Sequence, residues 1–123
     1  MSYKVTIYKH HLMIEFIGST SLDENEMARR EIIETLFKEK MGKVLVDMTK
    51  ADLSNVSLDD LIEFGKSWEG LLFDTLTKFA TLVPYTNPFR DKVDLSLWVG
   101  STKGVRLKIF EEQSLALKWL GID

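Results

Sequence analysis

Side chains that could bind a ligand follow a short apolar run near the middle of the chain. Residues 44–46 are apolar, Asp47 ends the run, and Thr49, Ser54 and Ser57 come soon after it. Ligands of open α/β sheets bind in the crevice beyond the carboxyl ends of the strands. An acid at such an end can act in a site, or it can simply accept hydrogen bonds from loop amides. No second carboxylate or histidine stands at a recognisable spacing from Asp47, so the sequence favours the structural role.

A second group of polar residues follows another apolar run, at residues 79–83. Pro84 closes this run, and three residues with polar side chains come directly after it. We expect the loops after both strands to lie on the same side of the sheet, at the carboxyl ends of the strands. The predicted binding pocket is lined by Asp47, Thr49, Ser54, Ser57, Tyr85, Thr86 and Asn87.

The spacing of apolar residues predicts the elements that position these side chains. Residues 3–7 and 12–16 alternate apolar and polar side chains and predict a hairpin of two strands. Apolar rows spaced by four predict a long helix over residues 23–41, which Gly42 stops. Residues 43–48 are apolar at three consecutive central positions, which is typical of a strand covered by helices on both faces.

Capping residues predict two helices in the second half of the chain. Ser57 precedes Asp59 and Asp60, and its oxygen can accept from the first-turn amides of a helix that continues to Leu72. Asn87 can cap a helix whose first residue is a proline, although alternating apolar residues at 93–99 also fit a strand. The other predicted elements are strands at 79–83 and 105–109 and a closing helix that begins at 111–112 and runs to 120.

Length and composition predict a single folded domain over residues 1–123. The chain is 45% hydrophobic and 28% charged, which is enough apolar material for a core. Its net charge of -3 argues against binding to nucleic acid or anionic lipid, which requires clustered Lys and Arg. The absence of cysteine excludes disulfides and thiolate chemistry and fits the cytoplasm. Neither a secretion signal nor a transmembrane run is found.

Three patterns resemble known sites but lack a required part. His10 and His11 are adjacent in the hairpin, so we expect them at the surface of a turn, pointing to opposite faces. Residues 100–104 lack the Gly-Lys-Ser/Thr ending of a phosphate loop and lead into a strand. Residues 52–63 have the length of a calcium loop but carry Ser57 at the turn glycine. We therefore predict no metal site and no cofactor.

Several large apolar side chains invite a second interpretation. Aromatic residues at helical spacing more often fill a core, but an apolar pocket for a lipid or another small molecule is the alternative. The stretch 71–76 exceeds what one helix face can bury and could form a dimer contact or the wall of a pocket. The residues concerned are Met41, Trp68, Phe73, Phe89 and Trp98.

The predicted order of five strands and four helices indicates an α/β fold with a mostly parallel sheet, flanked by helices and joined by right-handed crossovers. Four segments resemble the SpoIIAA-like branch of the STAS superfamily. They are Gly-Ser-Thr-Ser-Leu at 18–22, Gly-Lys-Val-Leu-Val-Asp at 42–47, Val-Arg-Leu-Lys-Ile-Phe at 105–110 and Ala-Leu-Lys-Trp-Leu at 116–120. STAS domains occur in sulfate transporters and anti-sigma-factor antagonists, and this branch is often grouped with SEC14-like lipid-binding folds.

The resemblance also implies a regulatory residue. In phosphorylatable STAS regulators, a serine in an Asp-Ser-Ser-Gly or similar motif starts the helix after the central strand, and a kinase partner recognises it. Ser57 lies nearest to this place, with neither the preceding aspartate nor the following glycine. A phosphate there would gain from the free amides of the helix start, but Asp59 and Asp60 would repel it. The sequence therefore favours Ser57 as a cap, with phosphorylation as the alternative.

We expect a non-enzymatic STAS-like binding or regulatory module in the cytoplasm. Its partner would be either a protein or a small apolar ligand such as a lipid, and a homodimer is open as well. One alternative is an anti-sigma-antagonist-like regulator switched at Ser57. The other is a small hydrolase or transferase that uses Asp47 with Thr49 or with a loop residue.

Overall fold

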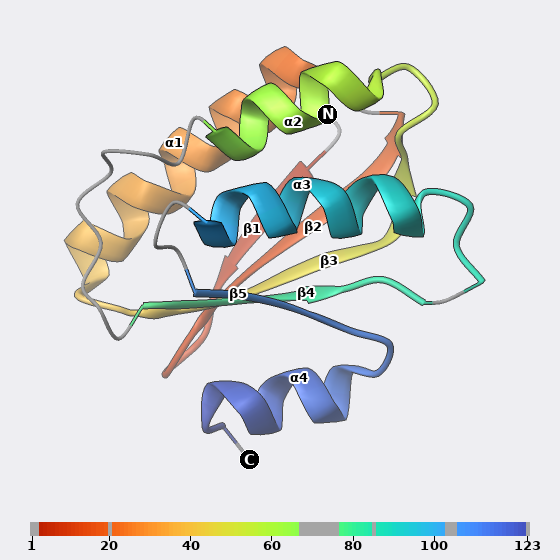
Figure 1. The fold of residues 1–123 in the computed structure, drawn as a ribbon. Helices are drawn as coiled ribbons and strands as arrows, with labels where there is room; N and C mark the ends of the chain where they lie inside the picture. The colour runs from red at the N-terminus through yellow and green to blue at the C-terminus, as the bar shows by residue number, and fades with distance from the viewer. Residues whose placement is uncertain (1–2, 20, 67–76, 85, 103–105, 123) are drawn as a thin grey trace.

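Strands and helices alternate through the chain in the predicted order (Figure 1). The computed structural model describes residues 3–19, 21–66, 77–84, 86–102 and 106–122. The predicted α/β class, with five strands and four helices, is confirmed. The elements are β1 (Tyr3–Ile7), β2 (Leu12–Ser19), α1 (Leu22–Glu39), β3 (Lys43–Asp52), α2 (Leu58–Lys66), β4 (Lys78–Leu82), α3 (Arg90–Thr102), β5 (Arg106–Phe110) and α4 (Gln113–Leu120).

The five strands lie in the sheet in chain order, from β1 at one edge to β5 at the other. β1 runs antiparallel to β2, with Val5 opposite Ile14, and the other neighbouring strands pair in parallel. The sheet is therefore mixed, which corrects the expectation of a mostly parallel sheet. The antiparallel pair follows from the short hairpin, because parallel strands need a long crossover between them.

Three helices cover one face of the sheet and one helix covers the other (Figure 1). The crossovers through α1, α2 and α3 each advance by one strand in the same direction. Since such crossovers are right-handed, all three helices fall on the same face. α4 follows the last strand and packs on the opposite face, where Ala116 and Leu120 are buried in a cluster with Leu45 and Ala80.

β3 lies in the middle of the sheet and is covered on both faces, as its apolar centre predicts. Val44 and Leu45 are both 0% exposed. Val44 belongs to the core cluster that includes Ile32 of α1, whereas Leu45 belongs to the cluster that includes Ala116 of α4. Successive side chains of a strand point to opposite faces, so these two neighbours join the two halves of the core.

β3 is longer than the predicted strand at 43–48. Its pairing with β4 stops where Asp47 lies opposite Leu82, but its pairing with β2 continues until Ser19 lies opposite Asp52. Asp47 therefore lies inside β3, and the prediction that this acid ends the strand is wrong. The second half of β3 is mostly polar, and its strand conformation comes from hydrogen bonds to β2 that residue periodicity does not reveal.

α1 begins and ends at residues that hydrogen-bond its free backbone groups. Ser21 is the N-cap, and its Oγ accepts a hydrogen bond from the backbone N–H of Glu24 at 3.3 Å. At the other end, Lys40 adopts a left-handed conformation with φ of 54° and donates its N–H to the carbonyl of Leu36. The helix therefore ends before Gly42, which is not the stop that the sequence predicted.

α3 is a helix, so the alternative of a strand at 93–99 is wrong. Val93 is buried and Leu97 half-buried, and both belong to a core cluster with Leu61 of α2. The predicted continuation of α2 to Leu72 and the apolar stretch at 71–76 lie outside the described residues.

His11 is buried in the hairpin, contrary to the expectation that both histidines lie at the surface. The backbone N–H of Tyr8 donates to the carbonyl of His11 at 2.9 Å, and the two rings stack with centroids 4.8 Å apart. His11 is 8% exposed, and its Nδ1 has no hydrogen-bond partner in the described structure. Burial lowers the pKa of His11, and the nearby charges of His10 and Lys43 lower it further.

This environment predicts a loss of stability in acid. Because the folded state disfavours the charged imidazole, the unfolded state takes up the proton first as the pH falls below the ordinary pKa of 6.5. The stability that neutral His11 contributes is present above that pH and is lost below it. Thermal unfolding at about pH 7.5 and about pH 5 measures this effect. The melting temperature of His11→Phe should fall less between the two pH values than that of the wild type. His10→Gln removes one of the charges that lower the pKa of His11, so its loss should lie between those of the wild type and His11→Phe. A His11→Phe protein that loses as much as the wild type would contradict the role of His11.

Candidate functional site

A cavity of about 90 Å³ lies between the sheet and the helices α1 and α3. We call it the α1–α3 cavity. Most of its lining is apolar, and three of the lining residues carry polar groups. The residues are Phe16, Asn25, Arg29, Ile32, Val46, Met48, Phe79, Thr81, Val93, Leu97 and Leu107.

The arrangement of the three helices leaves this space open. α1 and α3 lie over the same face of the sheet, but within the described part of the chain no Cα atom of one lies within 8 Å of a Cα atom of the other. α2 contacts both of them and lies on the side of α3 away from the sheet (Figure 1). The sheet between α1 and α3 is therefore not covered directly by a helix.

Strand alternation builds an apolar floor for the cavity. Val46 and Met48 of β3 are two residues apart, as are Phe79 and Thr81 of β4, so each pair points to the same face. Phe79 and Thr81 are 2% exposed. Thr81 places a hydroxyl group among these side chains, and it is the polar member of the floor.

α1 supplies the polar wall. Asn25, Arg29 and Ile32 are spaced by four and three residues, which places them on one face of the helix. Asn25 is 5% exposed, and its Oδ1 is a buried oxygen without a hydrogen-bond partner among the described residues. A buried polar group left in this state costs about 1–3 kcal/mol. A ligand that hydrogen-bonds to Asn25 would remove that cost.

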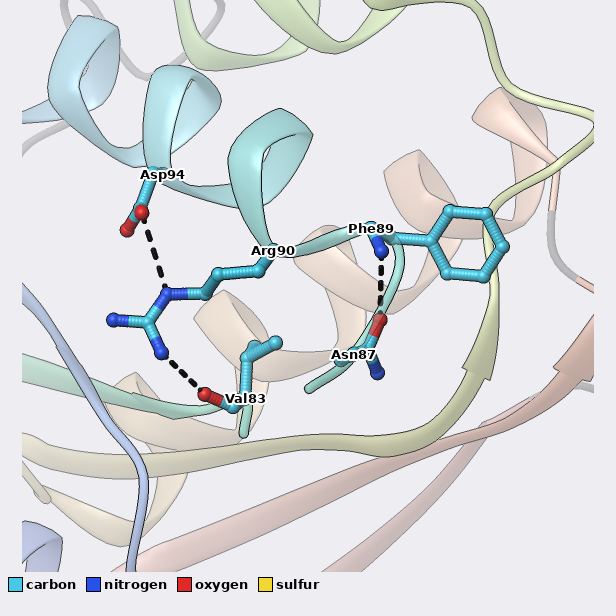
Figure 2. A network of polar contacts seen from close by, with 5 residues as sticks. All are labelled: Val83, Asn87, Phe89, Arg90 and Asp94. Atoms are coloured by element: carbon cyan, nitrogen blue, oxygen red, sulfur yellow. Dashed lines mark hydrogen bonds and ion pairs between the residues drawn. The ribbon is translucent and has the colours of Figure 1, made fainter. Parts of the chain in front are cut away.

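A network of polar contacts fixes the start of α3 beside the cavity (Figure 2). The side chain of Arg90 donates from Nη1 to the carbonyl of Val83 at 2.7 Å, and its Nε lies 3.3 Å from Oδ2 of Asp94. Asn87 accepts at Oδ1 from the backbone N–H of Phe89 at 2.8 Å. The buried guanidinium thus joins the end of β4 to the first turns of α3, the helix that carries Val93 and Leu97 to the cavity.

The predicted site residues of β3 hydrogen-bond to each other. Oδ1 of Asp47 accepts from the backbone N–H of Thr49 at 2.9 Å and from its hydroxyl at 2.7 Å. The carboxylate therefore stabilises its own strand locally, which is the structural role that the sequence favoured.

The serines after β3 also make local contacts. Oγ of Ser57 accepts from the backbone N–H of Asp60 at 3.1 Å, so the predicted cap of α2 is confirmed. The backbone N–H of Ser54 donates to Oδ1 of Asp52 at 2.9 Å. Hydrogen bonds from the side chain and backbone of Ser54 lower the pKa of Asp52. Both serines are exposed.

The second predicted loop follows β4. Asn87 makes the contact to Phe89 described above, Thr86 is exposed, and Tyr85 lies outside the described residues. The loops after β3 and β4 lie at the same end of the sheet, as expected for parallel strands (Figure 1). The described members of the predicted set do not line the α1–α3 cavity, and their role in binding stays a prediction.

Two polar residues of the cavity stand out in the sequence, although they belong to no motif. Asn25 stands three residues before Ala28, in the row that continues with Ile32 and Leu36 on the buried face of α1. A polar residue in such a row is unusual, because it must find a partner or remain unsatisfied. Thr81, in the middle of an otherwise buried apolar strand, is a similar signal.

Neither the models of protein families nor the curated proteins give a match to this chain. The resemblance to STAS domains therefore stays a prediction.

Among the described residues, no helix is both long and apolar enough to cross a membrane. In the same ranges, no three or more His, Asp or Glu side chains gather where they could hold a metal ion.

The unsatisfied carboxamide predicts that Asn25 lowers the stability of the ligand-free protein. Asn25→Leu should raise the free energy of unfolding by about 1–2 kcal/mol, because it replaces a buried polar group by an apolar one. Asn25→Ala should raise it less. Helix propensity alone would rank alanine above leucine, so the order of the two variants in urea unfolding separates the causes. Equal or lower stability of the leucine variant would contradict an unsatisfied Asn25.

The cap on α2 gives a second prediction. Ser57→Ala should lower the free energy of unfolding by about 1 kcal/mol, because the amide of Asp60 loses its acceptor. Ser57→Asp should retain most of the stability, since aspartate also caps and its charge suits the helix start. Denaturant unfolding of both variants measures this. An unchanged alanine variant would show that the cap contributes little.

Proposed function

We propose that this chain is a non-enzymatic, STAS-like binding module that holds a small apolar molecule in the α1–α3 cavity. The observation that carries the proposal is the cavity itself, which is lined by eight apolar residues among the eleven lining residues that the structure describes. Sites for small molecules are concave and mostly apolar, with a few polar groups that fix the orientation of the ligand. Asn25, Arg29 and Thr81 would be those groups here.

The size of the cavity limits the ligand and its affinity. An engineered apolar cavity of about 150 Å³ in another protein binds benzene. A space of about 90 Å³ therefore suits a chain of a few carbons. Each buried methylene contributes about 0.8 kcal/mol, so a six-carbon chain gains at most about 5 kcal/mol. Association costs about 4 kcal/mol or more. We therefore expect the apolar chain alone to bind more weakly than about 1 mM, and polar contacts to lower the dissociation constant.

The resemblance to the SpoIIAA-like branch supports the same proposal. Members grouped with SEC14-like folds are associated with apolar ligands, and this chain has the sheet and helices to enclose one. We place the module in the cytoplasm because the chain has no cysteine. A protein partner that responds to the bound molecule would make the module regulatory.

The two alternatives have less support from the described contacts. Ser57 is exposed, but its oxygen already serves as the cap of α2. Asp47 accepts two hydrogen bonds from Thr49. The cavity, in contrast, contains a polar atom, Oδ1 of Asn25, that has no hydrogen-bond partner among the described residues and could accept a hydrogen bond from a ligand.

Filling the cavity with a larger side chain should weaken binding. In NMR titrations with 1-hexanol, the wild type should show saturable shifts at residues that line the cavity. Leu97→Phe adds volume inside the cavity and should weaken hexanol binding by about tenfold or more, since overpacked sites resist insertion. Leu115→Phe is the matched control, because Leu115 is 50% exposed on α4. It should bind like the wild type.

Two outcomes would contradict the proposed function. The first is a wild type that binds neither hexanol nor a related six-carbon molecule at any concentration below their solubility. The second is a Leu97→Phe protein that binds as well as the wild type, which would place the ligand elsewhere.

A further inference from the structure

We infer that the ligand of the α1–α3 cavity is a short aliphatic acid with a hydroxyl group next to its carboxylate. This inference rests on the proposed function and adds the chemistry of the head group. The carboxylate would pair with Arg29, the hydroxyl would donate to Asn25, and the aliphatic tail would occupy the apolar floor.

Asn25 indicates the hydroxyl. Its Oδ1 is buried without a hydrogen-bond partner in the described ranges, and the residue lines the cavity at 5% exposure. An amide oxygen can only accept hydrogen bonds, so the matching ligand group must be a donor. A hydroxyl, an ammonium or an N–H group would meet this requirement.

Arg29 indicates the negative charge. It stands four residues after Asn25, so their side chains are neighbours on the same face of α1. The guanidinium is always charged and carries five N–H donors in a planar fork that fits a carboxylate. Its Nε atom is buried, and a charge interaction is stronger there than in water. The fork has enough donors to bind a ligand carboxylate in addition to its contacts within the protein.

The rest of the lining decides between a hydroxyl and an ammonium. The lining residues of the cavity include no aspartate or glutamate among those that the structure describes. An ammonium would therefore lose its hydration without a countercharge and would face Arg29, a like charge. A hydroxyl loses much less on burial and needs one acceptor, which Asn25 provides. Amino acids are accordingly disfavoured relative to hydroxy acids with the same tail.

The position of the polar wall sets the direction of the ligand. Both groups of the wall come from α1, whereas α3 contributes Val93 and Leu97. The head group would thus lie against α1 and the tail would extend over β3 and β4 towards α3. Thr81 of β4 adds a hydroxyl group to the floor, and it could bind a polar substituent on the ligand.

The test compares four six-carbon probes by isothermal titration calorimetry: 2-hydroxyhexanoate, hexanoate, 1-hexanol and norleucine. We expect 2-hydroxyhexanoate to bind most tightly. Loss of the hydroxyl in hexanoate should weaken binding by about threefold to tenfold, the usual effect of one hydrogen bond. 1-Hexanol lacks the carboxylate. It should bind more weakly than 2-hydroxyhexanoate by at least the same factor, because hydrogen bonds to charged groups are stronger.

Variants assign each effect to its residue. In Asn25→Leu, hexanoate and 2-hydroxyhexanoate should bind equally, because the acceptor for the hydroxyl is absent. In Arg29→Met, hexanoate should lose its advantage over 1-hexanol. Arg30→Met is the matched control, since Arg30 is exposed on α1 and should leave the order of the probes unchanged. If Arg29→Met does not fold, Arg29→Lys keeps the charge without the fork and should weaken carboxylate binding by a smaller factor.

The outcomes separate the two proposals. If no probe binds, the proposed function fails and this inference fails with it. If 1-hexanol binds as tightly as 2-hydroxyhexanoate, the apolar site stands and the acidic head group is wrong. If hexanoate equals 2-hydroxyhexanoate in the wild type, or if norleucine binds more tightly than both, the role assigned to Asn25 is overturned.

Discussion

The handedness of the crossovers is the constraint on which this architecture depends. Because every parallel connection advances one strand in the same direction, right-handed crossovers place α1, α2 and α3 on a single face. α4 alone covers the other face. Three helices on a five-stranded sheet cannot all lie flat against it. α2 packs on α1 and α3. In the described ranges the Cα atoms of α1 and α3 stay more than 8 Å apart, and side chains of both helices line the cavity.

The cavity lies between the main core and the polar side chains that we assign to ligand binding. Its floor is part of the main core, since Phe16 and Phe79 are buried in the cluster beneath α1. Its wall carries Asn25, whose Oδ1 is buried without a hydrogen-bond partner in the described ranges, and a ligand with a donor group would supply one. Folded proteins retain unsatisfied buried groups rarely. A carboxamide of this kind beside a cavity is therefore stronger support for a ligand site than the exposed polar loops, whose hydrogen bonds are local.

Particular elements show how far the chain could be predicted from its residues. The cap at Ser57 followed from short-range rules, and the hydrogen bond to Asp60 confirms it. Asn87 accepts from Phe89, but α3 begins at Arg90, so the prediction that Pro88 is its first residue is wrong. The length of β3 could not be predicted, because the polar residues after Asp47 form a strand through hydrogen bonds to β2. The burial of His11 depended on a hairpin that folds Tyr8 onto its ring. The position of Asp47 after an apolar run suggested a site residue, yet its carboxylate accepts hydrogen bonds from Thr49 in its own strand.

Residue spacing and local capping were sufficient for the class of the fold, the order of its elements and the coverage of β3 on both faces. These properties depend on contacts within a few residues and on the periods of strand and helix. The faces occupied by the helices, the true extent of β3 and the cavity depend on how distant segments assemble. Asn25, Thr81 and Leu97 belong to three separate elements. They line one cavity only because the sheet and its crossovers bring them together. Residue spacing within one element does not predict contacts between distant segments.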